Sequence, residues 1–253
     1  MKTILSKIYP HPMFLITILF FILLGRFRMI CYFTILITIH ELGHIITGIY
    51  FKWKINKIII LPFGMLTKFD IDINTKLIEE FIVSISGIVF QYIFYIIVKN
   101  YVSYSYFSYI NTFIILFNLI PINPLDGYKI LNVFINKITS FYNSLYVSSY
   151  ISFILIILLN VLLFNINKMI IFVSIFLLIE TIKNYKNSNN IFNKFLLERY
   201  LKKYRFKYSK KIKSTYEMKK DYKHLFYVDN KCITEYTFLL KMFDIKGKVW
   251  YHL

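Results

Sequence analysis

The sequence predicts a polytopic α-helical membrane protein, with about six transmembrane helices and a small cytoplasmic C-terminal tail of helix and strand. Of its 253 residues, 57% are apolar and 17% are charged, and the mean hydropathy is +0.56. An ordinary soluble domain is about 45–50% apolar and about 25% charged. Long apolar runs recur through the first 182 residues, and most of the net charge of +18 follows them. This composition excludes a disordered or fibrous protein and disfavours a cytosolic globular enzyme.

Six apolar runs of nearly bilayer-spanning length account for the predicted spans. They cover about 12–27, 29–51, 78–98, 104–121, 145–164 and 167–182. The first run follows Lys2 and Lys7 as in a signal peptide, but no small-residue cleavage site comes after it, so we expect an uncleaved first span. A proline-rich stretch begins at Pro121, where the fourth run ends. Such irregular backbone is tolerated at membrane depth only where protein or water surrounds it.

The basic residues predict how these spans are oriented, because the cytoplasmic segments of membrane proteins are enriched in lysine and arginine. With six spans, 27 of the 31 basic residues fall on the side that holds both termini, and 4 fall on the other side. We therefore expect an integral, multi-pass membrane protein with both termini in the cytoplasm.

Residues 183–253 form the predicted tail, which holds 18 basic and 6 acidic residues. Apolar side chains alternate with basic ones in its first part, which predicts an amphipathic linker helix beside the membrane surface. These apolar residues are Ile191, Phe195, Leu197 and Leu201. A strand at 224–228, a turn at Asp229–Asn230 and a short helix at 237–243 predict a small C-terminal module. We thus expect a transmembrane domain at 1–182 and the linker and module at 183–253.

The strongest chemical signal is the sequence His40-Glu41-Leu42-Gly43-His44 inside the second apolar run. Ionisable residues at membrane depth usually serve a function. Residues four apart share one face of a helix, so both imidazoles can bind one metal ion. Glu41 lies beside them, as the general base does in metalloproteases that carry an HExxH motif. A purely structural histidine pair would leave polar groups unsatisfied in lipid, which argues against that alternative.

A catalytic zinc ion needs a third protein ligand, and Asp126 is the candidate. The other histidines lie at the membrane edge, in the tail and next to the C-terminus. Pro121, Pro124 and Gly127 surround Asp126 at the end of the fourth run, where they would break the helix and let the carboxylate turn inward. A helix-capping aspartate at the water boundary is the alternative explanation.

Two motifs together resemble a known family. The HELGH sequence and the later stretch from Asn118 to Gly127, which reads N-x-x-P-x-x-P-L-D-G, resemble the site-2 protease family of intramembrane zinc metalloproteases. Leu61-Pro62-Phe63-Gly64 and the segment from Phe195 to Tyr200 resemble the membrane-associated loop and the linker of its sporulation branch. Members of that branch release a membrane-tethered sigma factor precursor. The resemblance runs over nearly all of residues 10–205.

The resemblance implies a role for each matching residue. His40, His44 and Asp126 would bind one Zn²⁺ per chain, and Glu41 would be the catalytic base. Asn118 would contact the substrate backbone or the tetrahedral intermediate at the active site.

Other matching residues would shape the site or contact the substrate. Pro124 would form the turn that aims Asp126. Gly87 and Gln91 fall where the family has a Gly-x-x-x-Asn motif, and Gln91 replaces the usual asparagine; an interhelical hydrogen bond is its alternative role. Pro62 and Phe63 lie in a loop that would present an extended substrate by strand addition, or that would simply lie at the membrane surface.

The predicted partner is a membrane-associated protein substrate, a sporulation sigma factor precursor (pro-sigma-K), in the mother-cell membrane around the forespore. Membrane partners that inhibit or activate the protease are also compatible with this resemblance. No nucleic acid is expected, because no recognition motif accompanies the basic residues. Sporulation relatives carry a nucleotide-sensing CBS domain, but only about 50 residues follow Arg205, so a reduced or absent CBS-like domain is expected and ATP binding is doubtful.

Two other functions compete with proteolysis. A non-proteolytic zinc-binding membrane regulator would share the motif, although the intact Glu41 argues against it. A transporter would also place polar groups at membrane depth, but the sequence has no paired, interrupted repeats.

Overall fold

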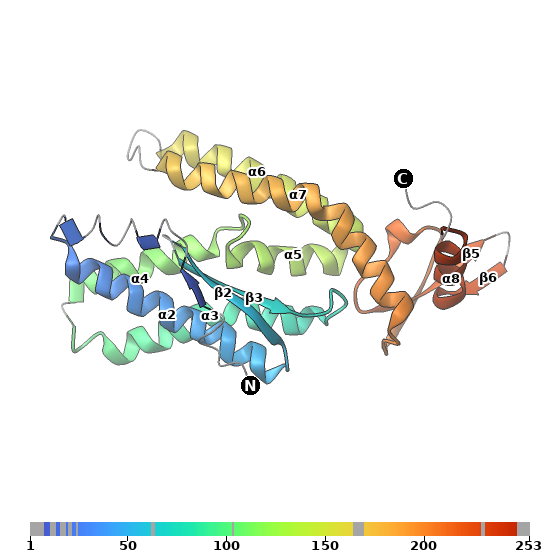
Figure 1. Ribbon diagram of the computed structural model, residues 1–253, viewed down its shortest axis with the longest axis horizontal. Helices are drawn as coiled ribbons and strands as arrows, with labels where there is room; N and C mark the ends of the chain where they lie inside the picture. Colours follow the sequence, from blue (N-terminus) through green and yellow to red (C-terminus); the bar gives the residue numbers. More distant parts are fainter. Residues whose placement is uncertain are drawn as a thin grey trace. The chain divides into compact units, whose positions relative to one another are not determined.

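The computed structural model describes residues 8–10, 14–15, 19, 22–23, 25–61, 64–102, 104–163, 170–228 and 231–246. The chain divides into two compact units. The first comprises residues 1–71, 79–120 and 125–127, and the second comprises 72–78, 121–124 and 128–253. Figure 1 colours their elements along the sequence.

The first unit contains three helices and a small sheet. The helices are α2 (Phe27–Tyr50), α3 (Leu77–Val98, from Glu79 onward in this unit) and α4 (Tyr104–Leu119). The strands are β1 (Ile8–Pro10), β2 (Lys54–Leu61) and β3 (Gly64–Asp70). Strand β2 pairs in parallel with β1 and antiparallel with β3, in the order β1-β2-β3. In the described part of the chain, β3 is therefore an edge strand.

Small residues let the elements of this unit approach α2 closely. A Cβ atom on Gly43 would lie 2.7 Å from the Ser86 carbonyl oxygen of α3, so only glycine permits this approach. A Cβ atom on Gly48 would lie 2.6 Å from the Phe69 ring of β3. Both contacts fix the neighbours of α2 along the half of the helix that carries the HELGH motif.

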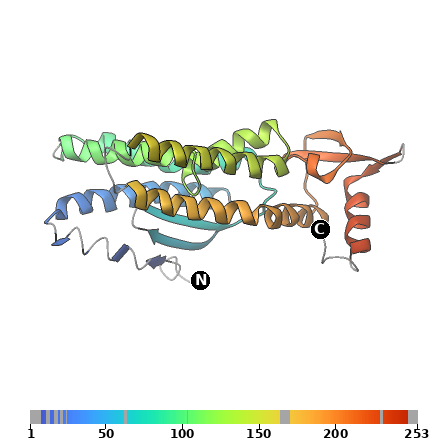
Figure 2. The same cartoon turned by 90° about the horizontal axis from the view of Figure 1, so that it is seen from above.

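The second unit contains most of α5 (Asp126–Ile138), together with α6 (Phe141–Leu163), α7 (Ile170–Leu201) and α8 (Glu235–Lys246). A short 3₁₀ helix, η2, covers Thr215–Glu217. The strands are β4 (Tyr208–Ile212), β5 (Tyr222–Val228) and β6 (Lys231–Thr234), and β5 pairs in parallel with β4 and antiparallel with β6. Helices α6 and α7 pack along each other, as both ribbon views show (Figures 1 and 2).

The helices can be compared with the six expected spans. Among the described residues, three helices are long and apolar enough to cross a membrane: Phe27–Tyr50, Leu77–Val98 and Phe141–Leu162. The fourth expected span corresponds to the shorter apolar helix α4, and the sixth to the first part of α7. The first expected span, 12–27, lies largely outside the described residues. The protein is mainly helical as predicted, and the count of six spans stays a prediction.

The linker helix predicted in the tail is present as the last part of α7, and its place at a membrane surface stays a prediction. Its residues continue α7, which runs without a break for 32 residues. Phe195 is fully buried in the core of the C-terminal module, whereas Leu197 and Leu201 are exposed. The reason is that Phe195 finds aromatic and aliphatic partners in the module, such as Phe141 and Phe192, and buries more apolar area there.

The later tail elements lie where the sequence predicts them. The strand expected at 224–228 is β5, and the helix expected at 237–243 lies within α8. The turn at Asp229–Asn230 lies outside the described residues. The expected domain boundary at 182/183 lies inside α7 and does not coincide with the two compact units, so it stays a prediction.

Candidate active site

Three predicted ligands meet in the first unit. His40 and His44 lie one turn apart on α2, and Asp126 is the first residue of α5. The Oδ2 atom of Asp126 is 2.9 Å from Nε2 of His40 and 3.0 Å from Nε2 of His44, and the two Nε2 atoms are 3.2 Å apart. All three side chains are buried. Helix periodicity brings the histidines together, and the tertiary fold adds the carboxylate 82 residues further along the chain.

The opposite nitrogen of each imidazole ring is held by a hydrogen-bond acceptor. His40 Nδ1 lies 2.9 Å from Oε1 of Gln91, and His44 Nδ1 lies 2.7 Å from the carbonyl oxygen of Val83. A neutral imidazole carries one proton, so donation from Nδ1 leaves a lone pair on Nε2. Metal-binding histidines are usually oriented by such a second partner.

Gln91 itself is anchored by α4. Its Nε2 group donates to the side-chain and backbone oxygens of Asn111, at 3.1 and 3.3 Å. These two bonds turn the amide so that Oε1 faces His40. Gln91 therefore makes the interhelical hydrogen bond that was the alternative prediction, and it orients His40 at the same time.

Two glycines allow the ligands to come this close. A Cβ atom on Gly87 would lie 2.4 Å from Nε2 of His44 and 2.7 Å from Nε2 of His40, so a larger residue would occupy the space between the rings. A Cβ atom on Gly127 would lie 2.2 Å from the carbonyl oxygen of Leu119, so glycine lets the start of α5 pack against the end of α4. These steric limits explain why Gly87 and Gly127 flank the site.

Glu41 lies directly beside the ligands on α2 and is also buried. Thr67 of β3 donates a hydrogen bond of 2.5 Å to its Oε2 atom. No sequence pattern singles out Thr67, Asn111 or the Val83 carbonyl, because each acts on a residue that is distant along the chain.

The donor set fits a zinc ion. Two imidazole nitrogens and one carboxylate oxygen, within 4.8 Å of one another, form the described cluster that can hold a metal. Tetrahedral ligands about 2.0–2.2 Å from zinc would be roughly 3.3–3.6 Å apart, only slightly farther than the 2.9–3.2 Å found here. Three converging lone pairs repel one another unless a cation or a proton lies between them, and two histidines with one carboxylate favour zinc.

The structure does not bring every predicted residue to this cluster. The described hydrogen bond of Asn118 goes from its Nδ2 group to the Ile114 carbonyl oxygen of its own helix. Pro124 follows a cis peptide bond with Asn123, and Asn123 donates to the Glu180 carbonyl oxygen of α7. Pro62 and Phe63 lie outside the described residues. Their predicted roles, and that of Asn118, stay predictions.

Comparison with known proteins identifies the family. Residues 28–105 match the family described as Peptidase family M50. The chain is 31% identical over 215 residues to Stage IV sporulation protein FB of Bacillus subtilis (strain 168), across 80% of this chain and 74% of that protein. The chain belongs to the site-2 protease family. The structure of the site-2 protease from Methanocaldococcus jannaschii is also similar, with a TM-score of 0.56 and 25% identity over 70% of this chain and 90% of that one.

The comparisons confirm the predicted family. Together with the apolar helices, they make this site-2 protease a membrane protein and an intramembrane metalloprotease of the site-2 type. The matched segment 28–105 contains the HELGH helix and Gln91, and Asp126 lies beyond it.

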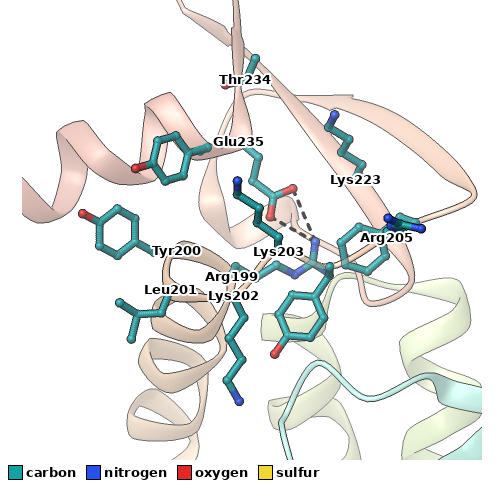
Figure 3. A pocket seen from close by; sticks show the side chains of 12 residues that line it. Arg199, Tyr200, Leu201, Lys202, Lys203, Arg205, Lys223, Thr234 and Glu235 are labelled. Carbon is teal, nitrogen blue, oxygen red and sulfur yellow. Dashed lines mark hydrogen bonds and ion pairs between the residues drawn. The ribbon is translucent and has the colours of Figure 1, made fainter.

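The second unit of this site-2 protease contains a separate pocket of about 1120 Å³ (Figure 3). It is lined by twelve residues of the C-terminal part, many of them basic or aromatic. They are Arg199, Tyr200, Leu201, Lys202, Lys203, Tyr204, Arg205, Phe206, Lys223, Thr234, Glu235 and Tyr236. The figure shows the Arg199 guanidinium pointing towards the Glu235 carboxylate.

Arg199 is occupied by protein partners. Its Nη1 atom donates to Glu235 Oε1 at 3.1 Å and to the Tyr222 carbonyl oxygen at 2.7 Å, and its guanidinium stacks over the Phe206 ring. Further bonds reach Asn74 Oδ1 and the Lys219 carbonyl oxygen. This arginine therefore holds the module together, and ATP binding by the tail receives no support from it.

Proposed function

We propose that the chain is a zinc-dependent intramembrane endopeptidase that cleaves a membrane-tethered protein, with a sporulation sigma factor precursor of the pro-sigma-K type as its substrate. The observation that carries this proposal is the convergence of His40, His44 and Asp126 beside the buried carboxylate of Glu41. Two imidazole nitrogens and one carboxylate oxygen converge there, which is a donor set that suits zinc.

His40, His44 and Asp126 would hold one zinc ion. Zinc, when bound there, lowers the pKa of a water ligand towards about 7 and polarises the scissile carbonyl group. Glu41 then accepts a proton from the attacking water and returns it to the leaving amine. We propose that Asn118 contacts the substrate backbone or the developing oxyanion, as the family resemblance suggests.

The edge strand β3 is the proposed docking element for the substrate. The carbonyl groups of a helical substrate are occupied by hydrogen bonds, so the segment to be cleaved must become extended. An extended peptide can add to the free edge of a sheet through main-chain hydrogen bonds. Strand β3 offers such an edge and carries Thr67, which contacts Glu41. Pro62 and Phe63, between β2 and β3 in the sequence, are predicted to contribute to the same element.

The sporulation role rests on the Bacillus subtilis relative, whose name places it in stage IV of sporulation. We propose by extension that the enzyme acts in the mother-cell membrane around the forespore, with both termini in the cytoplasm, and that membrane partners regulate it. The charge distribution supports this orientation, since 27 of the 31 basic residues fall on the side of the termini in the six-span topology.

Co-expression with pro-sigma-K tests the proposal. We expect cleavage by the wild-type chain and none by Glu41→Gln, which keeps the shape of the side chain but cannot accept the proton. Glu180→Gln is the matched control, because the Glu180 carboxylate pairs with the exposed Lys183. Cleavage by Glu41→Gln at the wild-type rate would refute the catalytic assignment. Zinc binding without cleavage by the wild type would instead favour the non-proteolytic regulator.

A further inference from the structure

The hydrogen bond between Thr67 and Glu41 joins the edge strand to the helix that carries the metal ligands. The Thr67 hydroxyl donates this bond and the Glu41 carboxylate accepts it. Its oxygen lies 2.5 Å from Oε2 of Glu41. The Thr67 residue is 9% exposed and Glu41 is 6% exposed, so the bond is shielded from water.

The alternation of β3 explains why Thr67 reaches this position. Side chains two residues apart lie on the same face of a strand, so Met65, Thr67 and Phe69 face the same way. Phe69 packs against Gly48 of α2, and Met65 packs against the apolar cluster that contains Leu36. Thr67 is thus held from both sides at the level of Glu41.

The bond engages one of the two carboxylate oxygens of Glu41. Thr67 engages Oε2, and among the described residues Oε1 of Glu41 has no hydrogen-bond partner. Turning the carboxylate plane away from Thr67 would break this bond at a buried position, which is unfavourable. The bond therefore holds the plane of the carboxylate, and the second oxygen is the one proposed to accept a proton.

We infer that Thr67 is a positioning residue that orients the general base Glu41, so that proton acceptance depends on the same strand that receives the substrate. This inference rests on the proposed proteolytic function. In this assignment the Thr67 side chain contacts neither the reacting bond nor the metal, and it acts through the Glu41 carboxylate.

The test uses the full-length enzyme with pro-sigma-K as substrate. Thr67→Val keeps the shape and the strand preference of the side chain but removes the donor, and Thr67→Ser restores it. We expect Thr67→Val to lower kcat about 10–100-fold with little change in KM, as loss of an outer partner does at metal sites. Thr67→Ser should stay within a few-fold of the wild type.

A matched control and a second measurement separate positioning from folding. Thr38→Val removes a hydroxyl on α2 whose hydrogen bond among the described residues goes to the Thr34 carbonyl oxygen of the same helix, and it should leave kcat unchanged. All variants should retain one zinc per chain by metal analysis. The infrared carboxylate band that Glu41→Gln removes should shift in Thr67→Val and stay in place in Thr38→Val.

The outcomes are distinguishable. Wild-type kcat with an unshifted band in Thr67→Val would overturn the inference, and so would a loss of zinc or a change confined to KM. If the wild type itself does not cleave and resembles Glu41→Gln, the proposed function fails. The infrared band then still decides whether Thr67 orients Glu41.

Discussion

Each unit of the protein contains a buried polar cluster, and the two clusters are built in opposite ways. In the second unit, the positive Arg199 meets the negative Glu235, and the remaining donors of the guanidinium reach carbonyl and amide oxygens. In the first unit, His40, His44 and Asp126 direct acceptor atoms at one another. Both clusters are equally buried, so burial alone does not distinguish them.

The difference distinguishes a cluster that stabilises the surrounding fold from one that is suited to bind a metal ion. A buried cluster whose charges and hydrogen bonds are satisfied internally holds its surroundings together. A buried cluster of converging ligand atoms needs a cation or a proton between them. The comparison therefore supports the HELGH cluster as the proposed metal site and gives Arg199 a structural role, even though Arg199 lines the pocket of Figure 3.

The largest expected effect is the loss of zinc from Asp126→Ala. Removing one of three ligands should lower zinc affinity by more than the about 10–100-fold that loss of an outer partner causes. Metal analysis of the purified chain measures this loss. Asp70→Ala, at an exposed position of β3, should retain the zinc. Equal zinc content in both variants would remove Asp126 from the ligand set.

The next largest effect is on the stability of the C-terminal module, and zinc binding should be unchanged. Arg199→Met leaves the buried Glu235 carboxylate without its cation, which should destabilise the C-terminal module by about 3–5 kcal/mol. Pulse proteolysis in urea measures the unfolding of the module in the full chain. Zinc content should remain at the wild-type level.

A double variant separates the lost charge pair from lost packing. If the charge pair is the cause, Arg199→Met combined with Glu235→Leu should recover much of the stability, because no unpaired charge remains buried. A double variant no more stable than Arg199→Met would contradict this explanation.

Gln91→Leu should weaken the metal site without destroying it. The variant removes the acceptor for His40 Nδ1 and should lower zinc affinity about 10–100-fold. Competition with a chelator measures the affinity. Asn111→Leu should produce a smaller decrease, because Asn111 acts only through Gln91. An unchanged affinity in Gln91→Leu would show that the His40 ring is held by other contacts.

The smallest expected effect is a pH dependence of the module. Burial lowers the pKa of His224 below its ordinary 6.5, so the unfolded chain binds the proton more readily than the folded one. Stability should therefore fall as the pH drops below about 6.5 and should be unaffected by this group at higher pH. Pulse proteolysis between about pH 7 and pH 5 measures the slope, and His224→Gln should flatten it.

Glu235 acts in a separate pH window. Burial opposes its charge, but the hydrogen bond from His224 and the charge of Arg199 outweigh burial and hold its pKa below 4.5. Its contribution to stability is present above pH 4.5 and is lost only as the pH falls through the lowered pKa. A slope that persists between about pH 7 and pH 5 in His224→Gln would therefore point to another group.

Patterns among neighbouring residues in the sequence were sufficient for much of the prediction. The apolar composition indicated a helical membrane protein, and the spacing of His40 and His44 indicated a shared helix face, because helix periodicity depends only on neighbouring residues. The run from His224 to Val228 before the predicted turn likewise located β5. The linker helix was also located as the end of α7, but the sequence did not indicate that Phe195 is buried while Leu197 and Leu201 are exposed, because part of the cluster around Phe195 comes from distant parts of the chain.

By itself, the sequence determined the class of protein, the HELGH helix and the chemical identity of the candidate ligands. Only the tertiary structure decided that Asp126 meets both histidines, that Gln91 and the Val83 carbonyl contact their Nδ1 atoms, and that Thr67 bonds to Glu41. The physical reason is the same in each case. These contacts join residues that are 26 to 86 positions apart, and their geometry depends on how helices and strands pack rather than on any repeat along the chain.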